Sequence, residues 1–179
     1  GKARWRSDQP AGIGLGLAYS HDGIRLAVVS WGTVCILDAE SGMHLHTFPG
    51  RGYAVVFTPD GSGVVRGLRH PEAGASQTNL MSGITVHIES LDATTFNRLR
   101  YSPDGKLLVA LSEQETILTD ARTEQVVGRG PGSKAAGVGA LAFHPTEPLL
   151  VYSNGAKLVV YDLKTQTPIT DRTRSRKYI

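Results

Sequence analysis

The sequence holds a single cysteine, Cys35, and no Asn-x-Ser/Thr acceptor among its 179 residues. Because no intrachain disulfide can form, the fold has to be stable without one, and a reducing, intracellular setting is expected. No apolar run approaches the roughly 20 residues that a membrane-spanning helix needs. The N-terminus also shows no apolar stretch typical of a secretory signal. We therefore expect a cytoplasmic protein with no transmembrane segment.

Charge is also scarce, because 19 Lys and Arg residues against 16 Asp and Glu residues give a net charge of only +3. Seven of the 19 basic residues lie in the two terminal segments, and the middle of the chain is close to neutral. This excludes a basic face that covers the whole protein. Hydrophobic residues make up 40% of the chain and glycine occurs 21 times, which is typical of a turn-rich globular domain and not of a disordered chain.

An aromatic residue closes a short apolar run at four places, and a tight turn follows each time. The aromatic residues are spaced 38, 44 and 42 positions apart: Tyr19, Phe57, Tyr101 and Phe143. A second anchor is spaced 41, 41 and 42 positions apart: Ser41-Gly42, Ser82-Gly83, Thr123-Glu124 and Thr165-Gln166. Two anchors that run in step predict a repeat array.

The third repeat shows what each unit contains. Residues 96–101 alternate between apolar and polar, as in a strand with one buried face, and Pro103-Asp104-Gly105 supplies a turn. Residues 107–111 form a continuous apolar run suited to an inner strand, 116–118 form a third strand, and 125–127 begin a fourth. Because the other repeats follow the same order, each is predicted to be four short antiparallel strands.

Four-stranded units of about 40 residues resemble the blades of WD40-type β-propellers, and the resemblance covers roughly residues 13–172. The aromatic-Ser-Pro-Asp-Gly turn that is common in this family stands at residues 101–105. The resemblance implies an all-β fold in which residues 1–179 form one propeller segment of four four-stranded antiparallel blades. The expected blades are approximately 13–48, 53–89, 96–128 and 138–172.

The sequence departs from the family at two motifs. The aspartate that ends the third strand is kept at Asp38, Asp120 and Asp162, but the tryptophan that should precede it is absent. The Gly-His pair that should precede the first strand is absent from all four repeats. The buried Asp–His–Ser/Thr–Trp network of typical blades therefore cannot form, and we expect apolar packing and turn chemistry to hold the blades.

Four blades make about half of the seven-bladed ring that is usual in the family. An open arc of four would leave two faces with exposed apolar surface and unpaired backbone. Three arrangements are open: the chain belongs to a longer ring, a second copy completes eight blades, or four blades close on themselves. We expect part of a larger or oligomer-completed ring.

The repeats are interrupted at two places, and long loops on a rigid scaffold are where binding tends to reside. Extra residues occur at about 70–78, between the second and third strands of the second blade, and at about 129–137, between the third and fourth blades. Both connections should emerge at the same end of the ring. The candidate binding residues are His70, Glu72, Gln77, Arg129 and Lys134.

These features predict a non-catalytic protein–protein interaction scaffold, a propeller module within a larger protein or complex. A propeller enzyme would need carboxylates or histidines on the first strands, which read Leu-Ala, Ala-Val-Val, Arg-Leu-Arg and Ala-Leu-Ala. No cofactor is expected. No metal is expected either, because His44 and His46 could share an ion but have no identifiable third ligand.

An alternative function is electrostatic binding of nucleic acid or anionic membrane through the basic terminal segments. Side chains at alternate positions of a strand face the same side, and the residues concerned are Arg4, Arg6, Arg172, Arg174, Arg176 and Lys177. Like charges on terminal strands also deter wrong pairing, so protection of the edges is the competing interpretation.

Overall fold

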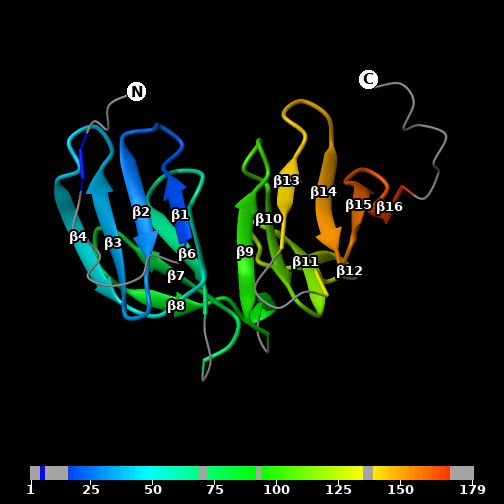
Figure 1. The fold of residues 1–179 in the computed structure, drawn as a ribbon, viewed down its shortest axis with the longest axis horizontal. Coiled ribbons are helices and arrows are strands. Elements are labelled where there is room, and N and C mark those ends of the chain that lie inside the picture. Colours follow the sequence, from blue (N-terminus) through cyan, green and yellow to red (C-terminus); the bar gives the residue numbers. More distant parts are fainter. Residues whose placement is uncertain (1–4, 7–15, 69–71, 92–93, 135–138, 170–179) are drawn as a thin grey trace.

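The computed structural model describes residues 5–6, 16–68, 72–91, 94–134 and 139–169. In these ranges the chain forms four separate antiparallel sheets of four strands each, which confirms the predicted all-β architecture (Figure 1). Each sheet follows the order of its strands in the sequence, so every blade is a simple meander.

The blades have the following strands. The first contains β1 (Gly16–Tyr19), β2 (Arg25–Val29), β3 (Thr33–Asp38) and β4 (His44–Pro49). The second contains β5 (Ala54–Phe57), β6 (Gly63–Gly67), β7 (Ala75–Asn79) and β8 (Thr85–His87), followed by a 3-10 turn, η1 (Glu89–Leu91). The third contains β9 (Phe96–Tyr101), β10 (Leu107–Ser112), β11 (Glu115–Asp120) and β12 (Val126–Pro131). The fourth contains β13 (Leu141–Phe143), β14 (Leu149–Asn154), β15 (Lys157–Asp162) and β16 (Thr167–Pro168).

The four blades form an arc and not a closed ring. The first strand of each blade contacts the first strand of the next, from β1 to β5, from β5 to β9 and from β9 to β13. Within the described ranges no contact of similar extent joins β13 back to β1, and Figure 1 shows the first and fourth blades standing apart at the two ends of the arc. Of the three arrangements left open by the sequence, closure of four blades on themselves is therefore not the one adopted.

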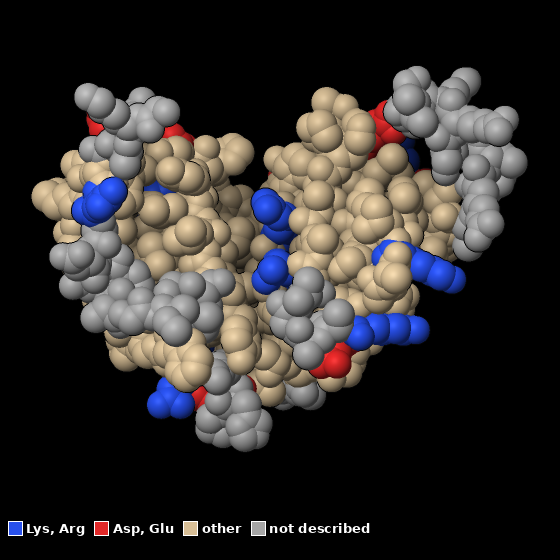
Figure 2. All heavy atoms as spheres, viewed as in Figure 1, with Lys and Arg blue, Asp and Glu red and all other residues tan. Residues whose placement is uncertain are grey.

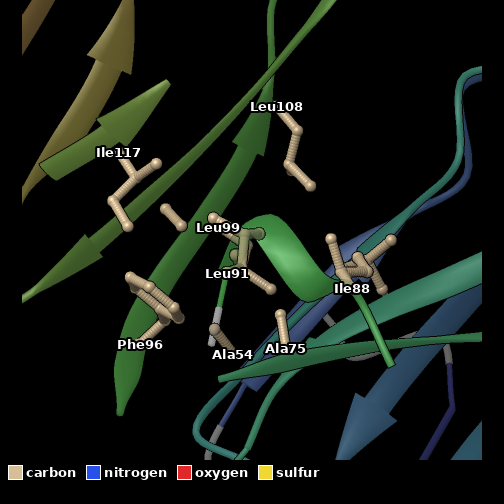
Figure 3. Close-up of a cluster of buried hydrophobic side chains, with 10 residues drawn as sticks. Ala54, Ala75, Ile88, Leu91, Phe96, Leu99, Leu108 and Ile117 are labelled. Atoms are coloured by element: carbon tan, nitrogen blue, oxygen red, sulfur yellow. The ribbon is translucent and has the colours of Figure 1, made fainter. Parts of the chain in front are cut away.

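The apolar core lies between consecutive blades. Between the second and third blades, Leu91 of η1 lies among Ala75 and Ile88 on one side and Phe96 and Leu99 on the other (Figure 3). Leu91 and Phe96 are both 0% exposed. Complete burial of one such side chain contributes about 1.5–3 kcal/mol, so the junction between two blades is where much of the stability arises.

Side chains on the two faces of each sheet take part in different junctions. In the first blade, Ala27 and Val29 of β2 pack toward the second blade, together with Val55 and Phe57 of β5. Val28, which lies between them in the sequence, belongs to a separate cluster on the opposite face. This alternation follows from the period of a strand, and it means that each inner blade buries both of its faces.

The aromatic-and-turn anchors owe their shape to a small hydrogen-bond network. In the third blade the Ser102 hydroxyl donates to Asp104 at 2.6 Å and accepts from the backbone N–H of Leu107 at 3.0 Å. Gly105 takes a φ of 71°, which glycine adopts at little cost. The same arrangement recurs in the first two blades, where Ser20 donates to Asp22 and Thr58 donates to Asp60.

The second anchor closes the turn between the third and fourth strands. The carboxylate of Asp120 accepts hydrogen bonds from the backbone N–H and the hydroxyl of Thr123, at 2.7 and 3.0 Å. In the second blade, Asn79 takes the place of the aspartate, and its amide oxygen accepts from the backbone N–H of Ser82 at 2.9 Å. Every blade therefore has a polar side chain that closes this turn, although the sequence lacks the aspartate in one of them.

The close approach of the second and third blades predicts a large cost for a single added methyl group. A Cβ at Gly67, on β6, would overlap the backbone carbonyl of Phe96 on β9. We expect Gly67→Ala to lower the free energy of unfolding by about 1–3 kcal/mol, as overpacking in a core does. Gly32 is the matched control, because a Cβ there meets nothing within 4 Å, and Gly32→Ala should change stability by less than about 0.5 kcal/mol. Urea unfolding measures both, and equal effects of the two substitutions would contradict this packing.

Candidate functional site: a central groove and two open blade faces

The first strands of three blades line a groove of about 970 Å³. Its walls come from β1, β5 and β9 and from the turns that follow β5 and β9. Figure 2 shows the groove as a hollow between the two halves of the molecule. In a complete propeller the first strands surround the central channel, so this groove is the part of that channel which the arc encloses.

Two arginines on β9 carry the positive charge of the groove. Arg98 and Arg100 are both exposed, occupy alternate positions of the strand and line the groove. Lys and Arg side chains stand on the wall of the hollow over β9 in Figure 2. The guanidinium of Arg98 donates to the backbone carbonyl of Asn97 at 2.6 Å. Among the described residues no carboxylate forms an ion pair with either arginine, so both charges face the groove.

The remaining lining is apolar and aromatic. Leu17 and Tyr19, on β1, are 68% and 64% exposed at the opposite edge of the groove. Tyr101, at the end of β9, is half-buried, and burial raises the pKa of its phenol to about 12, with a further contribution from Asp60 and Glu124. Its hydroxyl is therefore neutral at physiological pH, and the groove offers guanidinium groups beside uncharged rings.

Ionised aspartates stand in the turns beside the groove, but their oxygens are already engaged. The Ser102 hydroxyl is the largest cause of the lowered pKa of Asp104, and the backbone N–H of Lys106 adds to it. Thr58 has the same effect on the pKa of Asp60. These carboxylates hold their own turns, as the common position in the repeat predicts.

Two of the predicted binding residues lie on strands and not in loops. β7 begins at Ala75, so Gln77 pairs with Val65 of the second strand. β12 runs on to Pro131, so Arg129 pairs with Ile117, and its guanidinium forms an ion pair with Glu115 at 2.5 Å. The prediction that Gln77 and Arg129 lie in insertions is therefore wrong, because β7 and β12 extend into these segments as far as both residues.

The other predicted binding residues are placed as follows. Glu72 is exposed in the connection between β6 and β7. Burial lowers the pKa of Arg66, and the charge of Glu72 opposes that shift. Lys134 is exposed just after β12, with its backbone N–H bonded to the carbonyl of Glu113. His70 lies outside the described residues. The structure thus places Glu72 and Lys134 at the same end of neighbouring blades without joining them, and their role in binding stays a prediction.

Most of the basic terminal residues also fall outside the described ranges. Arg6 is exposed, whereas Arg4, Arg172, Arg174, Arg176 and Lys177 are not described. His44 and His46 are exposed on β4, where the ring of His44 hydrogen-bonds with the hydroxyl of Thr47. In the described part of the chain, no three His, Cys, Asp or Glu side chains gather as a metal site requires. None of its helices has the length and apolar character to cross a membrane.

The outward face of the fourth blade repeats a face that is buried in the third. Val109 and Leu118 pair across β10 and β11 and are 0% and 2% exposed against the fourth blade. The equivalent pair in the fourth blade is Val151 and Val160, which are half-buried. Leu158, on the same face, is 70% exposed. This face therefore has the residues of a blade junction, and none of the four described blades packs against it.

The outward face of the first blade is partly covered. Trp5 packs against the cluster that includes Val28 and Leu37, and its ring nitrogen donates to a backbone carbonyl at 3.2 Å. Leu17 and Tyr19 continue this face toward the groove and are exposed. Both ends of the arc thus present apolar side chains to solvent.

The arrangement of the blades matches solved propellers. The β-propeller domain of Cps50 (Swd1) from Myceliophteria thermophila superposes with a TM-score of 0.63 at 15% identity, over 83% of this chain and 51% of that one. Hydrazine synthase of Kuenenia stuttgartiensis gives the same TM-score of 0.63 at 15% identity, over 88% of this chain and 46% of that one. The fold is a β-propeller arc. It spans about half the length of these two chains, and no family model and no curated protein matches the sequence.

The turn network of the propeller arc predicts a pH-dependent contribution to stability. The folded state lowers the pKa of Asp104 below its ordinary value of 3.8. The contribution is complete above the pKa of the unfolded chain and is lost as the pH falls through the lower folded pKa. Asp104→Asn should therefore reduce stability at pH 7, and its difference from the native chain should shrink by pH 3. Ser102→Ala removes the largest cause of the lowered pKa. In urea unfolding it should also reduce stability at pH 7 by more than at pH 3. Differences that stay constant with pH would contradict this account.

Proposed function

We propose that this chain is a segment of a non-catalytic protein-interaction scaffold, in which further blades complete the ring and the central groove receives a protein partner. The observation that carries the proposal is the open face of the fourth blade, because Val151, Leu158 and Val160 repeat positions that elsewhere join one blade to the next. Apolar surface of this kind marks interaction sites on soluble proteins.

The occupant of the open faces is another four-stranded antiparallel blade. The apolar side chains of the face stand at the two-residue spacing of strands, and a sheet of the same pleat matches them. Solved propellers with this arrangement have chains about twice as long as the part that is matched, which is the room that further blades need. A blade supplied by a longer chain and a blade supplied by a second copy offer the same surface.

The chemistry of the groove supports a binding role. Guanidinium groups bind carboxylates through paired hydrogen bonds, and the exposed Leu17 and Tyr19 offer apolar contact. Cys35 is buried and free, which suits the reducing cytoplasmic setting expected from the sequence. The scaffold would thus bind a partner through guanidinium–carboxylate pairs and apolar contacts. The strands that carry these side chains are held in place by the neighbouring blades.

The open faces predict that the chain associates in solution. In sedimentation equilibrium the native chain should show masses above that of the 19.2 kDa monomer, rising with concentration. Leu158→Asp places a charge on the open face and should shift the population toward monomer. Met81→Asp is the matched control, because Met81 is 97% exposed in the turn after β7, and it should leave association unchanged. A native chain that stays monomeric at all concentrations, or an unchanged Leu158→Asp variant, would overturn ring completion.

A further inference from the structure

The two groove arginines have the spacing of an extended peptide. Arg98 and Arg100 are two residues apart on β9, and two residues of a strand span about 6.6–6.8 Å. Alternate side chains of any extended polypeptide repeat at the same distance. A segment that lies along β9 with acidic residues at every second position would therefore set one carboxylate opposite each guanidinium.

No carboxylate in the described ranges pairs with Arg98 or Arg100, so both can bind such carboxylates. Arg129 and Lys106 each form an ion pair with a carboxylate, whereas the recorded contact of Arg98 is to a neutral backbone carbonyl. Asp104 also lines the groove, but its carboxylate is held by Ser102 and by the backbone N–H of Lys106. A planar guanidinium binds a carboxylate with two parallel hydrogen bonds, which is stronger than contact with a neutral group.

The strand that carries the arginines points to a polypeptide in particular. Among the described residues, β9 pairs with β10 alone and is therefore the edge strand of its sheet. Extended peptides bind at the edges of sheets through hydrogen bonds of the main chain.

We propose that the central groove binds an acidic polypeptide segment in extended conformation, with alternate Asp or Glu side chains paired to Arg98 and Arg100. The inference names the partner of the interaction scaffold and rests on the proposed function above. Nucleic acid is the competing ligand. Proteins that bind it commonly neutralise several phosphates along the strand, and the groove wall offers two adjacent guanidinium groups, which suits a short acidic segment better.

A labelled peptide tests the assignment. The probe is a fluorescein-labelled peptide of about ten residues, roughly 33 Å when extended, with Glu and Thr in alternation, and the control peptide has Gln in place of Glu. Fluorescence anisotropy at about 50 mM salt, where charges are weakly screened, should show binding of the Glu peptide and much weaker binding of the Gln peptide.

Substitutions on the protein locate the site. The double variant Arg98→Gln, Arg100→Gln should weaken binding of the Glu peptide by about tenfold or more, as expected for the loss of two charge-assisted contacts. The double variant Arg98→Lys, Arg100→Lys keeps the positive charge but lacks the planar guanidinium. Its affinity for the Glu peptide should lie between that of the native chain and that of the double Gln variant. Arg122→Gln, at an exposed arginine in the turn after β11, is the matched control and should leave affinity unchanged. Equal circular dichroism and urea midpoints show that all variants are folded.

The outcomes separate this inference from its rivals. Equal binding of the Glu and Gln peptides, or full binding by the double Arg→Gln variant, overturns it. A labelled thymidine oligonucleotide that binds through the same arginines more tightly than the Glu peptide assigns the groove to nucleic acid and also overturns it. Sedimentation of the same samples separates the two proposals: a monomer that binds the Glu peptide contradicts ring completion alone, and an associating chain that does not bind it contradicts this inference alone.

Discussion

Packing of one blade against the next is the interaction on which the rest of this structure depends. A four-stranded sheet with small buried residues has two apolar faces and too little thickness to bury either by itself. Leu91 and Phe96 are fully buried only because the second and third blades meet around them. The approach is close enough that Gly67 leaves no room for a side chain against the backbone of the third blade. Each inner blade buries both of its apolar faces in this way, and each outer blade buries one.

Polar side chains hold the turns and so set the register that this packing requires. A register slip of one residue would exchange the two faces of a strand, and the hydroxyl–carboxylate pairs at the turns oppose such a slip. Ser102 with Asp104 fixes the hairpin between the first and second strands of its blade, and Asp120 with Thr123 fixes the hairpin between the third and fourth. These local pairs stand where WD40-type blades, which this chain resembles, typically have a buried Asp–His–Ser/Thr–Trp network.

The sequence predicts the blades well and the bounds of the interrupted segments poorly, for physical reasons. Aromatic anchors and turn residues act locally, so the bounds of β9 are as predicted. β7 is hidden in the sequence because Ala75–Asn79 has small and polar residues whose burial depends on neighbouring blades. Asn79 takes the place of the aspartate that ends the third strand in the other blades. Arg98 and Arg100 are plain in the sequence as Arg-Leu-Arg, but only the packing of three blades makes them the wall of a groove. The open arc is as expected from the count of four blades, although no local pattern encodes the angles between the sheets that produce it.

Each end blade of the arc buries only one of its two apolar faces. The open face limits the stability of the arc, and it is also the face that further blades would cover in the proposed scaffold. Amide hydrogen exchange tests this claim most directly, because it reports the free energy of opening of each strand. The account predicts that amides in the paired strands of the inner blades, β6 and β10, exchange more slowly than those in β2 and β14 of the outer blades under conditions that keep the chain monomeric. It also predicts that the outer strands gain protection as the chain associates. Equal protection of all four blades in the monomer would contradict the account.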